Sequence, residues 1–257
     1  MTALLLVVAA SRIPRLNGME MNIDEVWSIW QTLGTPRQVL AWVPYDWPPL
    51  YYLALAGWKE LVGIHPVAVR YFSVLLGLCG TAFTYRLGLR LRSPQTGLLS
   101  AAVYASLGYA IFLSLTVRGY IAVYALFPLT MWLALRYFDR PRPMRAVALA
   151  IAMVTLFYLY YPSAIALAVL GLYTLVVDYR QAIRHWWLPG GLALMLAVPL
   201  IAAKTDLVIG RTEATRTVKL PPLFEAARRL LLEGYAGNAP VFWIAVFVLA
   251  TGLAVAQ

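Results

Sequence analysis

AVALAIAMVTLFYLYYPSAIALAVLGLYTLVV, residues 146–177, decides the fold class, because this stretch carries no charged side chain from end to end. Pro162 divides it into two apolar runs, 146–161 and 163–177. An α-helix rises about 1.5 Å per residue, so about 20 apolar residues cross a bilayer. The stretch therefore predicts two consecutive membrane helices joined by a tight turn.

Apolar runs of this kind recur along the chain. Hydrophobic residues make up 62% of it and charged residues 12%, and the mean hydropathy is +0.73, values that exclude an ordinary soluble domain. The predicted fold class is all-α: a polytopic transmembrane helical protein, with a single transmembrane domain over residues 1–257. We predict spans at 68–89, 97–115, 120–137, 146–161, 163–177, 187–203 and 239–256.

Both ends of the chain are abrupt. The first apolar stretch, 2–10, is about half a membrane thick and lacks the basic start and the cleavage site of a signal peptide. At the other end, Gln257 directly follows an apolar segment. We therefore expect the chain to be a fragment of a longer protein.

The net charge of +10 is distributed unevenly. The alternate short connections carry only Arg118 or no charge. Such asymmetry is the positive-inside pattern, which places the arginine-rich connections in the cytoplasm and removes the argument for a nucleic-acid partner. These connections hold Arg86, Arg90, Arg92, Arg136, Arg140, Arg142, Arg145, Arg180 and Arg184. Cys79 is the single cysteine, so no disulfide framework is expected.

Two long loops, about 11–67 and 204–238, are then predicted on the outer face of the membrane. They hold every acidic residue except Asp139 and Asp178. Chemically useful side chains are therefore concentrated on one side of the membrane.

We predict three amphipathic helices in these loops. Asn22 and Glu25 have the spacing of a capping box and start the first helix. Pro48 and Pro49 open the second, and the third covers about 223–231. We expect all three to lie in the membrane interface, where such helices can roof a cavity.

Four short motifs follow one another along the chain. They are Asp24-Glu25, Asp46-Trp47-Pro48-Pro49-Leu50-Tyr51-Tyr52, Val69-Arg70-Tyr71-Phe72-Ser73 and Arg118-Gly119-Tyr120. In these motifs the chain resembles the glycosyltransferase C superfamily, in the bacterial branch (glycosyltransferase family 39-like) related to dolichyl-phosphate-mannose protein mannosyltransferases and lipid A aminoarabinose transferases. The family patterns are Asp-His-Pro-Pro-Leu-Tyr-Tyr for the second motif and Glu-x-Arg-x-Tyr for the fourth. The resemblance runs from about residue 10 to 180.

The resemblance implies a membrane glycosyltransferase of a bacterial-type plasma membrane. Such enzymes move a sugar from a polyprenyl-phosphate carrier to an extracytoplasmic protein, lipid or glycan acceptor, with inversion at the anomeric carbon. The displacement needs a carboxylate to take or orient the acceptor proton and a positive charge to stabilise the departing phosphate.

Asp24 is the candidate base and Glu25 the candidate supporting acid. Two structural interpretations compete with these roles: Glu25 completes the capping box, and Asp24 complements the helix dipole. Arg118, with Tyr120 beside it in the same motif, is the candidate partner of the donor phosphate, or else of Asp24 or Asp46. Its alternative role is an interfacial anchor that reaches lipid headgroups.

Further candidates are less decisive. Asp46 either binds the acceptor or holds the Pro-Pro turn, and Trp47 is the aromatic residue expected to stack on sugar. Arg211, Arg216 and Lys219 would cover the phosphate as a lid or bind anionic headgroups.

Three positions depart from the family pattern. Thr116 replaces a glutamate, and Trp47 and Tyr160 replace histidines. These replacements remove carboxylate and imidazole groups, which are the ligands that divalent metals prefer. The sequence therefore shows no ligand spacing for a metal, and the cofactor is left open. The departures also permit a non-catalytic scaffold or binding subunit. A transporter is the third class, but it would place ionisable residues in mid-span, which are almost absent here.

Overall fold

The computed structural model describes residues 1–18, 20–42, 47–215 and 222, and within them the chain is helical without a strand. The all-α prediction is confirmed. The order of elements is α1 (Thr2–Arg12), the 3₁₀ helix η1 (Ile13–Asn17), α2 (Ile23–Trp30), α3 (Pro36–Trp42), α4 (Leu50–Val62), α5 (Pro66–Leu91), α6 (Pro94–Ser106), α7 (Gly108–Leu115), α8 (Tyr120–Asp139), α9 (Pro143–Leu159), α10 (Ser163–Val177) and α11 (Tyr179–Thr215).

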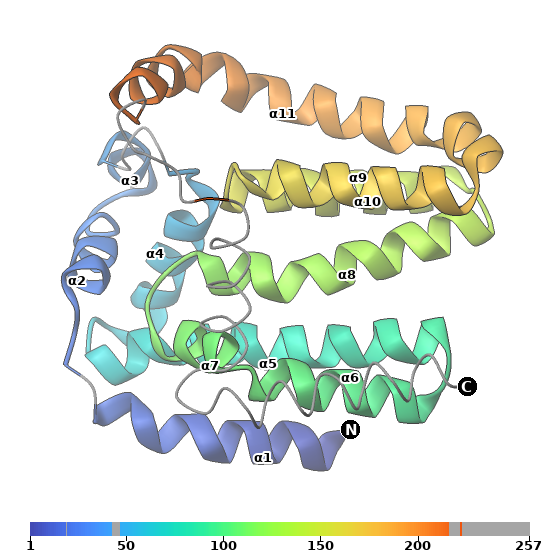
Figure 1. Ribbon diagram of the computed structural model, residues 1–257. Coiled ribbons are helices and arrows are strands. Elements are labelled where there is room, and N and C mark those ends of the chain that lie inside the picture. Colours follow the sequence, from blue (N-terminus) through green and yellow to red (C-terminus); the bar gives the residue numbers. More distant parts are fainter. Residues whose placement is uncertain (19, 43–46, 216–221, 223–257) are drawn as a thin grey trace.

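The long helices run side by side, and α2, α3 and α4 gather at one end of them (Figure 1). In the described residues three helices are long and apolar enough to cross a membrane: Pro66–Leu91, Tyr120–Asp139 and Tyr179–Ala202. They correspond to the spans predicted at 68–89, 120–137 and 187–203. α9 and α10 are shorter apolar helices that match 146–161 and 163–177. The span predicted at 239–256 and the helix predicted at 223–231 lie outside the described residues.

The span predicted at 97–115 is broken. α6 and α7 meet at an angle of 62°, because Leu107 has an extended ψ of 128°. The hydroxyl of Ser106 donates to the carbonyl of Val103, a local bond that competes with the helix. The bend carries the chain toward α5, where Ser73 Oγ donates to the carbonyl of Thr116 at 2.7 Å. It thereby positions the connection that holds Arg118.

α5 is the central helix, packed against both α6 and α8. At Gly88 it approaches α6 so closely that an added Cβ would lie 2.8 Å from the Cα of Gly97. Small residues permit this backbone approach between membrane helices.

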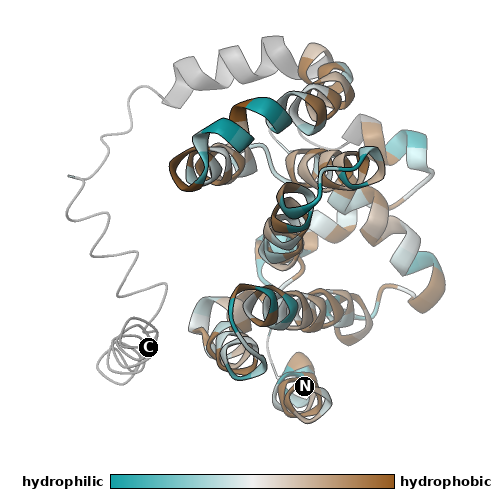
Figure 2. Cartoon of the chain, turned by 90° about the vertical axis from the view of Figure 1, so that its right-hand side faces the viewer, coloured by the Kyte–Doolittle hydropathy of each residue, from teal (hydrophilic) through white to brown (hydrophobic). Residues whose placement is uncertain are grey.

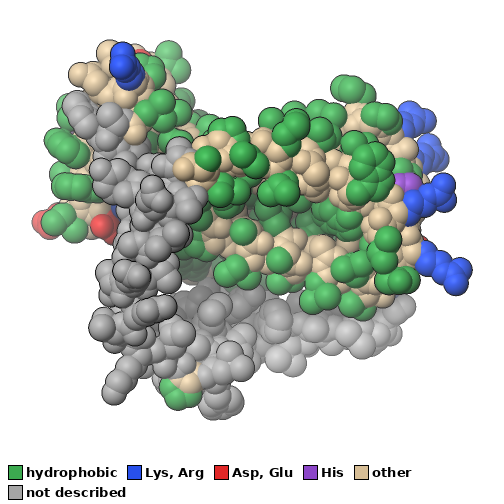
Figure 3. Space-filling model, turned by 90° about the horizontal axis from the view of Figure 1, so that it is seen from above, with side chains coloured by type: hydrophobic (Ala, Val, Ile, Leu, Met, Phe, Trp, Pro, Cys, Tyr) green, Lys and Arg blue, Asp and Glu red, His purple; other side chains and the backbone are tan. Residues whose placement is uncertain are grey.

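Charge separates along the helices. In the view from above, Figure 3 shows most of the visible lysine and arginine side chains at one end of the helices and the acidic side chains at the other. Figure 2, seen from the arginine-rich end, shows hydrophilic residues in the connections nearest the viewer. Large apolar side chains such as Val169, Leu172 and Leu194 are exposed along the helices between the two ends, as expected for contact with lipid.

Candidate active site

α2 begins with the predicted capping box. The Glu25 backbone N–H donates to Asn22 Oδ1 at 2.9 Å, and the Asn22 N–H donates to Glu25 Oε2 at 3.2 Å. Pro49 precedes α4, and Gly63, with a φ of 79°, ends it. The helix predicted from Asn22 ends at Trp30, and α3 follows as a separate helix that the sequence did not indicate.

Glu25 is fully buried and makes a two-point ion pair with Arg70 of α5. Arg70 Nε and Nη2 each donate to one oxygen of the carboxylate at 2.9 Å. The Val117 N–H donates to the same carboxylate at 3.0 Å. Because bidentate guanidinium–carboxylate pairs are strong and directional, Glu25 fixes α2, α5 and the 116–118 connection relative to one another.

Arg70 also ties down the segment before α2. Its guanidinium donates to the carbonyls of Leu16 and Glu20, each at 3.0 Å. Sequence reasoning assigned Arg70 no role. The signal was present, because a charged side chain inside a predicted span requires a partner.

Asp24 faces the surface. Adjacent helical residues point about 100° apart, so Glu25 turns inward and the Asp24 side chain is 65% exposed. Its carboxylate lies 3.9 Å from Arg118 Nη2, and its backbone carbonyl lies 3.5 Å from Arg118 Nη1. Both contacts are long for an ion pair and a hydrogen bond, so Asp24 holds Arg118 only weakly.

Arg118 lies against aromatic rings and is only 13% exposed. Its guanidinium carbon is 4.8 Å from the centroid of the Trp47 ring and 5.6 Å from that of Tyr120. Tyr160 completes the cluster, with its ring centroid 5.3 Å from Tyr120 and 6.3 Å from Trp47. Aromatic faces hold a guanidinium in place and leave it positively charged.

Tyr52 lies beneath this cluster. Burial raises the pKa of its hydroxyl to about 12, against an opposing effect of the Arg118 charge and a hydrogen bond with Ser28. Tyr52 is therefore a neutral hydrogen-bonding group at physiological pH, not an anionic partner for Arg118.

A sequence model of the dolichyl-phosphate-mannose-protein mannosyltransferase family matches residues 46–202. The chain belongs to this family. Searches of curated proteins and of solved structures return no match. A member of the dolichyl-phosphate-mannose-protein mannosyltransferase family is a membrane glycosyltransferase of the GT-C type that uses a lipid-linked sugar donor. Together with the apolar helices, membership makes this chain an integral membrane protein.

The mannosyltransferase family match includes Trp47, Arg70, Arg118 and Tyr120 but begins after Asp24 and Glu25. The structure brings Asp24, Trp47, Arg118 and Tyr120 together and places Glu25 behind them in its ion pair.

The remaining candidates are not placed. Asp46, Arg216 and Lys219 lie outside the described residues, and the side chain of Arg211 does so as well, although its backbone belongs to α11. In the described part of the chain no three His, Cys, Asp or Glu side chains come together as a metal site would require.

Proposed function

We propose that this glycosyltransferase moves a sugar from a polyprenyl-phosphate carrier to an extracytoplasmic acceptor, with inversion at the anomeric carbon. The proposal rests mainly on one observation: Asp24 and Arg118 lie 3.9 Å apart, and α2, which carries Asp24, lies at the end of the long helices opposite the arginine-rich connections. By the positive-inside rule that end is extracytoplasmic. We place the protein in a bacterial-type plasma membrane, as one domain with its working loops on the outer face.

The chemistry follows from the two charges. The acceptor oxygen attacks the anomeric carbon while Asp24 accepts its proton, and the bond between that carbon and the phosphate oxygen breaks. The electron pair leaves with the lipid phosphate, whose charge Arg118 stabilises. Glu25 supports both indirectly: from α2 it accepts the Val117 N–H of the 116–118 connection, and Arg70 ties it to α5.

The aromatic side chains give the sugar a surface. Trp47, Tyr120 and Tyr160 present rings beside the Arg118 guanidinium, and ring faces pack against the apolar C–H faces of sugars. In this proposal Asp46 binds the acceptor. Arg211, Arg216 and Lys219 would close over the phosphate, and the helices of the first and last outer loops would lie in the interface.

The test separates carrier binding from transfer. Purified protein is reconstituted in vesicles and given polyprenyl-phosphate-mannose, with a membrane extract as the source of acceptor. Asp24→Asn should lower the transfer rate about 10²- to 10⁴-fold while carrier binding is retained. Glu60→Gln, which removes an exposed carboxylate from α4, is the control and should leave transfer unchanged.

Two results would contradict the proposal. Equal transfer by wild type and Asp24→Asn would remove the carboxylate from the mechanism. Carrier binding without transfer in the wild type, under conditions that supply acceptor, would favour the scaffold or binding-subunit interpretation.

A further inference from the structure

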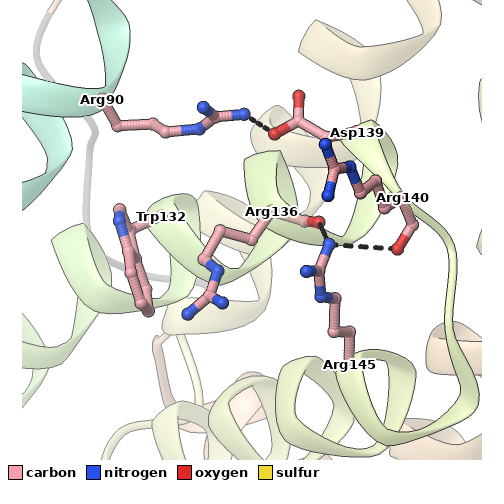
Figure 4. Close-up of a pocket in the computed structure, with 6 residues that line it drawn as sticks. All are labelled: Arg90, Trp132, Arg136, Asp139, Arg140 and Arg145. Carbon is pink, nitrogen blue, oxygen red and sulfur yellow. Dashed lines mark hydrogen bonds and ion pairs between the residues drawn. The ribbon is translucent and has the colours of Figure 1, made fainter.

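The arginine-rich end contains a cavity of about 430 Å³. Its lining comes from the end of α5, the end of α8, the α8–α9 connection and the start of α9 (Figure 4). We call it the arginine pocket, defined by Arg90, Trp132, Arg136, Asp139, Arg140 and Arg145.

The charges in the arginine pocket do not balance. Its four guanidiniums face one carboxylate, that of Asp139, which is paired with Arg90. Arg145 donates to the carbonyls of Arg136 and Arg140 at 2.8 and 3.2 Å and so caps the end of α8. Among the described residues, no carboxylate lies within ion-pair distance of Arg136 or Arg140. Like charges gathered around one hollow repel one another, and a bound anion would relieve that repulsion.

Membrane topology alone does not account for this arrangement. The positive-inside rule requires arginines in a connection, where separate solvated side chains satisfy it. Here α5, α8, the α8–α9 connection and α9 each contribute one guanidinium to the lining of one cavity. The guanidinium carbon of Arg136 lies 4.6 Å from the centroid of the Trp132 ring. Stacking on an aromatic face fixes the direction of its N–H groups.

A second, mostly apolar cavity shares one lining residue with the arginine pocket. Trp132 also lines a second cavity of about 100 Å³, with Phe83, Arg86 and Leu129. Phe83 lies on α5 before Arg90, and Leu129 lies on α8 before Arg136. At a rise of about 1.5 Å per residue, each pair is separated by about 10 Å along its helix. The apolar cavity therefore lies toward the middle of the helices. A ligand that fills both must be anionic at one end and apolar at the other.

We propose that the arginine pocket binds the phosphate headgroup of an anionic membrane lipid, with the start of an acyl chain in the cavity beside Trp132. Guanidiniums bind phosphate through paired N–H donors, and basic pockets between membrane helices are suited to such headgroups. This site is separate from the transfer site and does not depend on the proposed reaction.

The experiment compares two double variants with equal charge. Arg136→Gln/Arg140→Gln removes two charges from the pocket, and Arg180→Gln/Arg184→Gln removes two exposed charges of α11 outside it. Each full-length protein, purified in neutral detergent, is titrated with dioleoylphosphatidylglycerol, dioleoylphosphatidylcholine or inorganic phosphate. Binding is followed by the shift in thermal unfolding, and circular dichroism checks the helical content.

Wild type and the α11 variant should bind phosphatidylglycerol equally, and the pocket variant about 10- to 30-fold more weakly. Arg136→Lys/Arg140→Lys keeps the charge and should retain most of the binding. If the glutamine variant fails to fold, this lysine variant still tests whether the two positive charges are required. Equal loss in both glutamine variants, or equal binding of phosphatidylcholine, would overturn the proposal. Inorganic phosphate acting as strongly as the lipid would show a free-phosphate site instead.

Discussion

The two ends of α5 carry two ion pairs with opposite surroundings. Near its start Arg70 binds Glu25 with side-chain exposures of 0% and 1%. Near its end Arg90 binds Asp139 with exposures of 41% and 45%. The first pair joins segments that are otherwise held by few contacts, whereas the second lies at the edge of a cavity. The difference indicates that an ion pair in this protein contributes strongly to stability where water is excluded and weakly where it is not.

A second pair of arginines repeats the contrast. Arg118 and Arg136 both lie over a tryptophan ring, at 4.8 and 4.6 Å. Arg118 is mostly buried and lies beside one carboxylate, so it is suited to a single anion in a defined position. Arg136 is exposed and belongs to a crowded group of guanidiniums, which concentrates charge over a wider area.

The largest effect is expected at the buried pair. Glu25→Gln keeps a side chain that can complete the capping box but leaves Arg70 charged and buried, which should cost about 3–5 kcal/mol in the free energy of unfolding. Arg70→Met should cost a similar amount. The double variant should lose less than the sum of the two, measured by thermal unfolding in detergent with Glu60→Gln as the control. An additive double variant would show that the two side chains act independently.

The second prediction distinguishes Arg118 from Arg136 by their effect on carrier binding. Arg118→Gln should weaken binding of polyprenyl phosphate about 10- to 100-fold, because it removes charged donors from the phosphate. Arg136→Gln should leave that binding unchanged. Binding is measured by equilibrium titration in vesicles. Equal losses in both variants would mean that carrier recognition is not confined to the Asp24 end.

The third effect is the part of the alkaline loss of stability that Tyr52 contributes. The unfolded chain ionises tyrosine near pH 10, whereas Tyr52 holds its proton to about 12 in the folded protein. Between these values the unfolded state binds fewer protons, so Tyr52 alone should lower the free energy of unfolding by about 2.7 kcal/mol as the pH rises. Thermal unfolding from pH 9 to 12 measures this. Tyr52→Phe should remove that part of the slope, and Tyr173→Phe, on exposed α10 surface, should not.

The smallest effect is expected at the exposed pair. Arg90→Gln should change the free energy of unfolding by less than about 1 kcal/mol, because exposed ion pairs are screened by water. The same thermal unfolding assay tests this beside Glu25→Gln. A loss as large as that of Glu25→Gln would abolish the contrast between the two ends of α5.

Hydropathy and local capping rules were sufficient for the helical class, the order of the spans and the start of α2. These features depend on residues close together in the sequence. The pairing of Glu25 with Arg70 was not predicted, because it joins segments that are distant along the chain. The break at Leu107 was missed for a different reason: residues 97–115 carry no charge and no proline, and the weaker signal of Ser106 and Gly108 on either side of Leu107 was not used. Tyr160 was noted only as a departure from the family pattern, although its ring lies against Trp47 and Tyr120.

The packing of α5 has a mechanical consequence. Arg70 and Arg90 are separated by about 30 Å along the helix, close to the thickness of the hydrocarbon core of a bilayer. Since α5 packs against both α6 and α8, it cannot tilt alone to suit a thinner or thicker membrane. Hydrophobic mismatch must instead tilt the whole bundle or deform the surrounding lipid, so bilayer thickness will set the orientation of the protein.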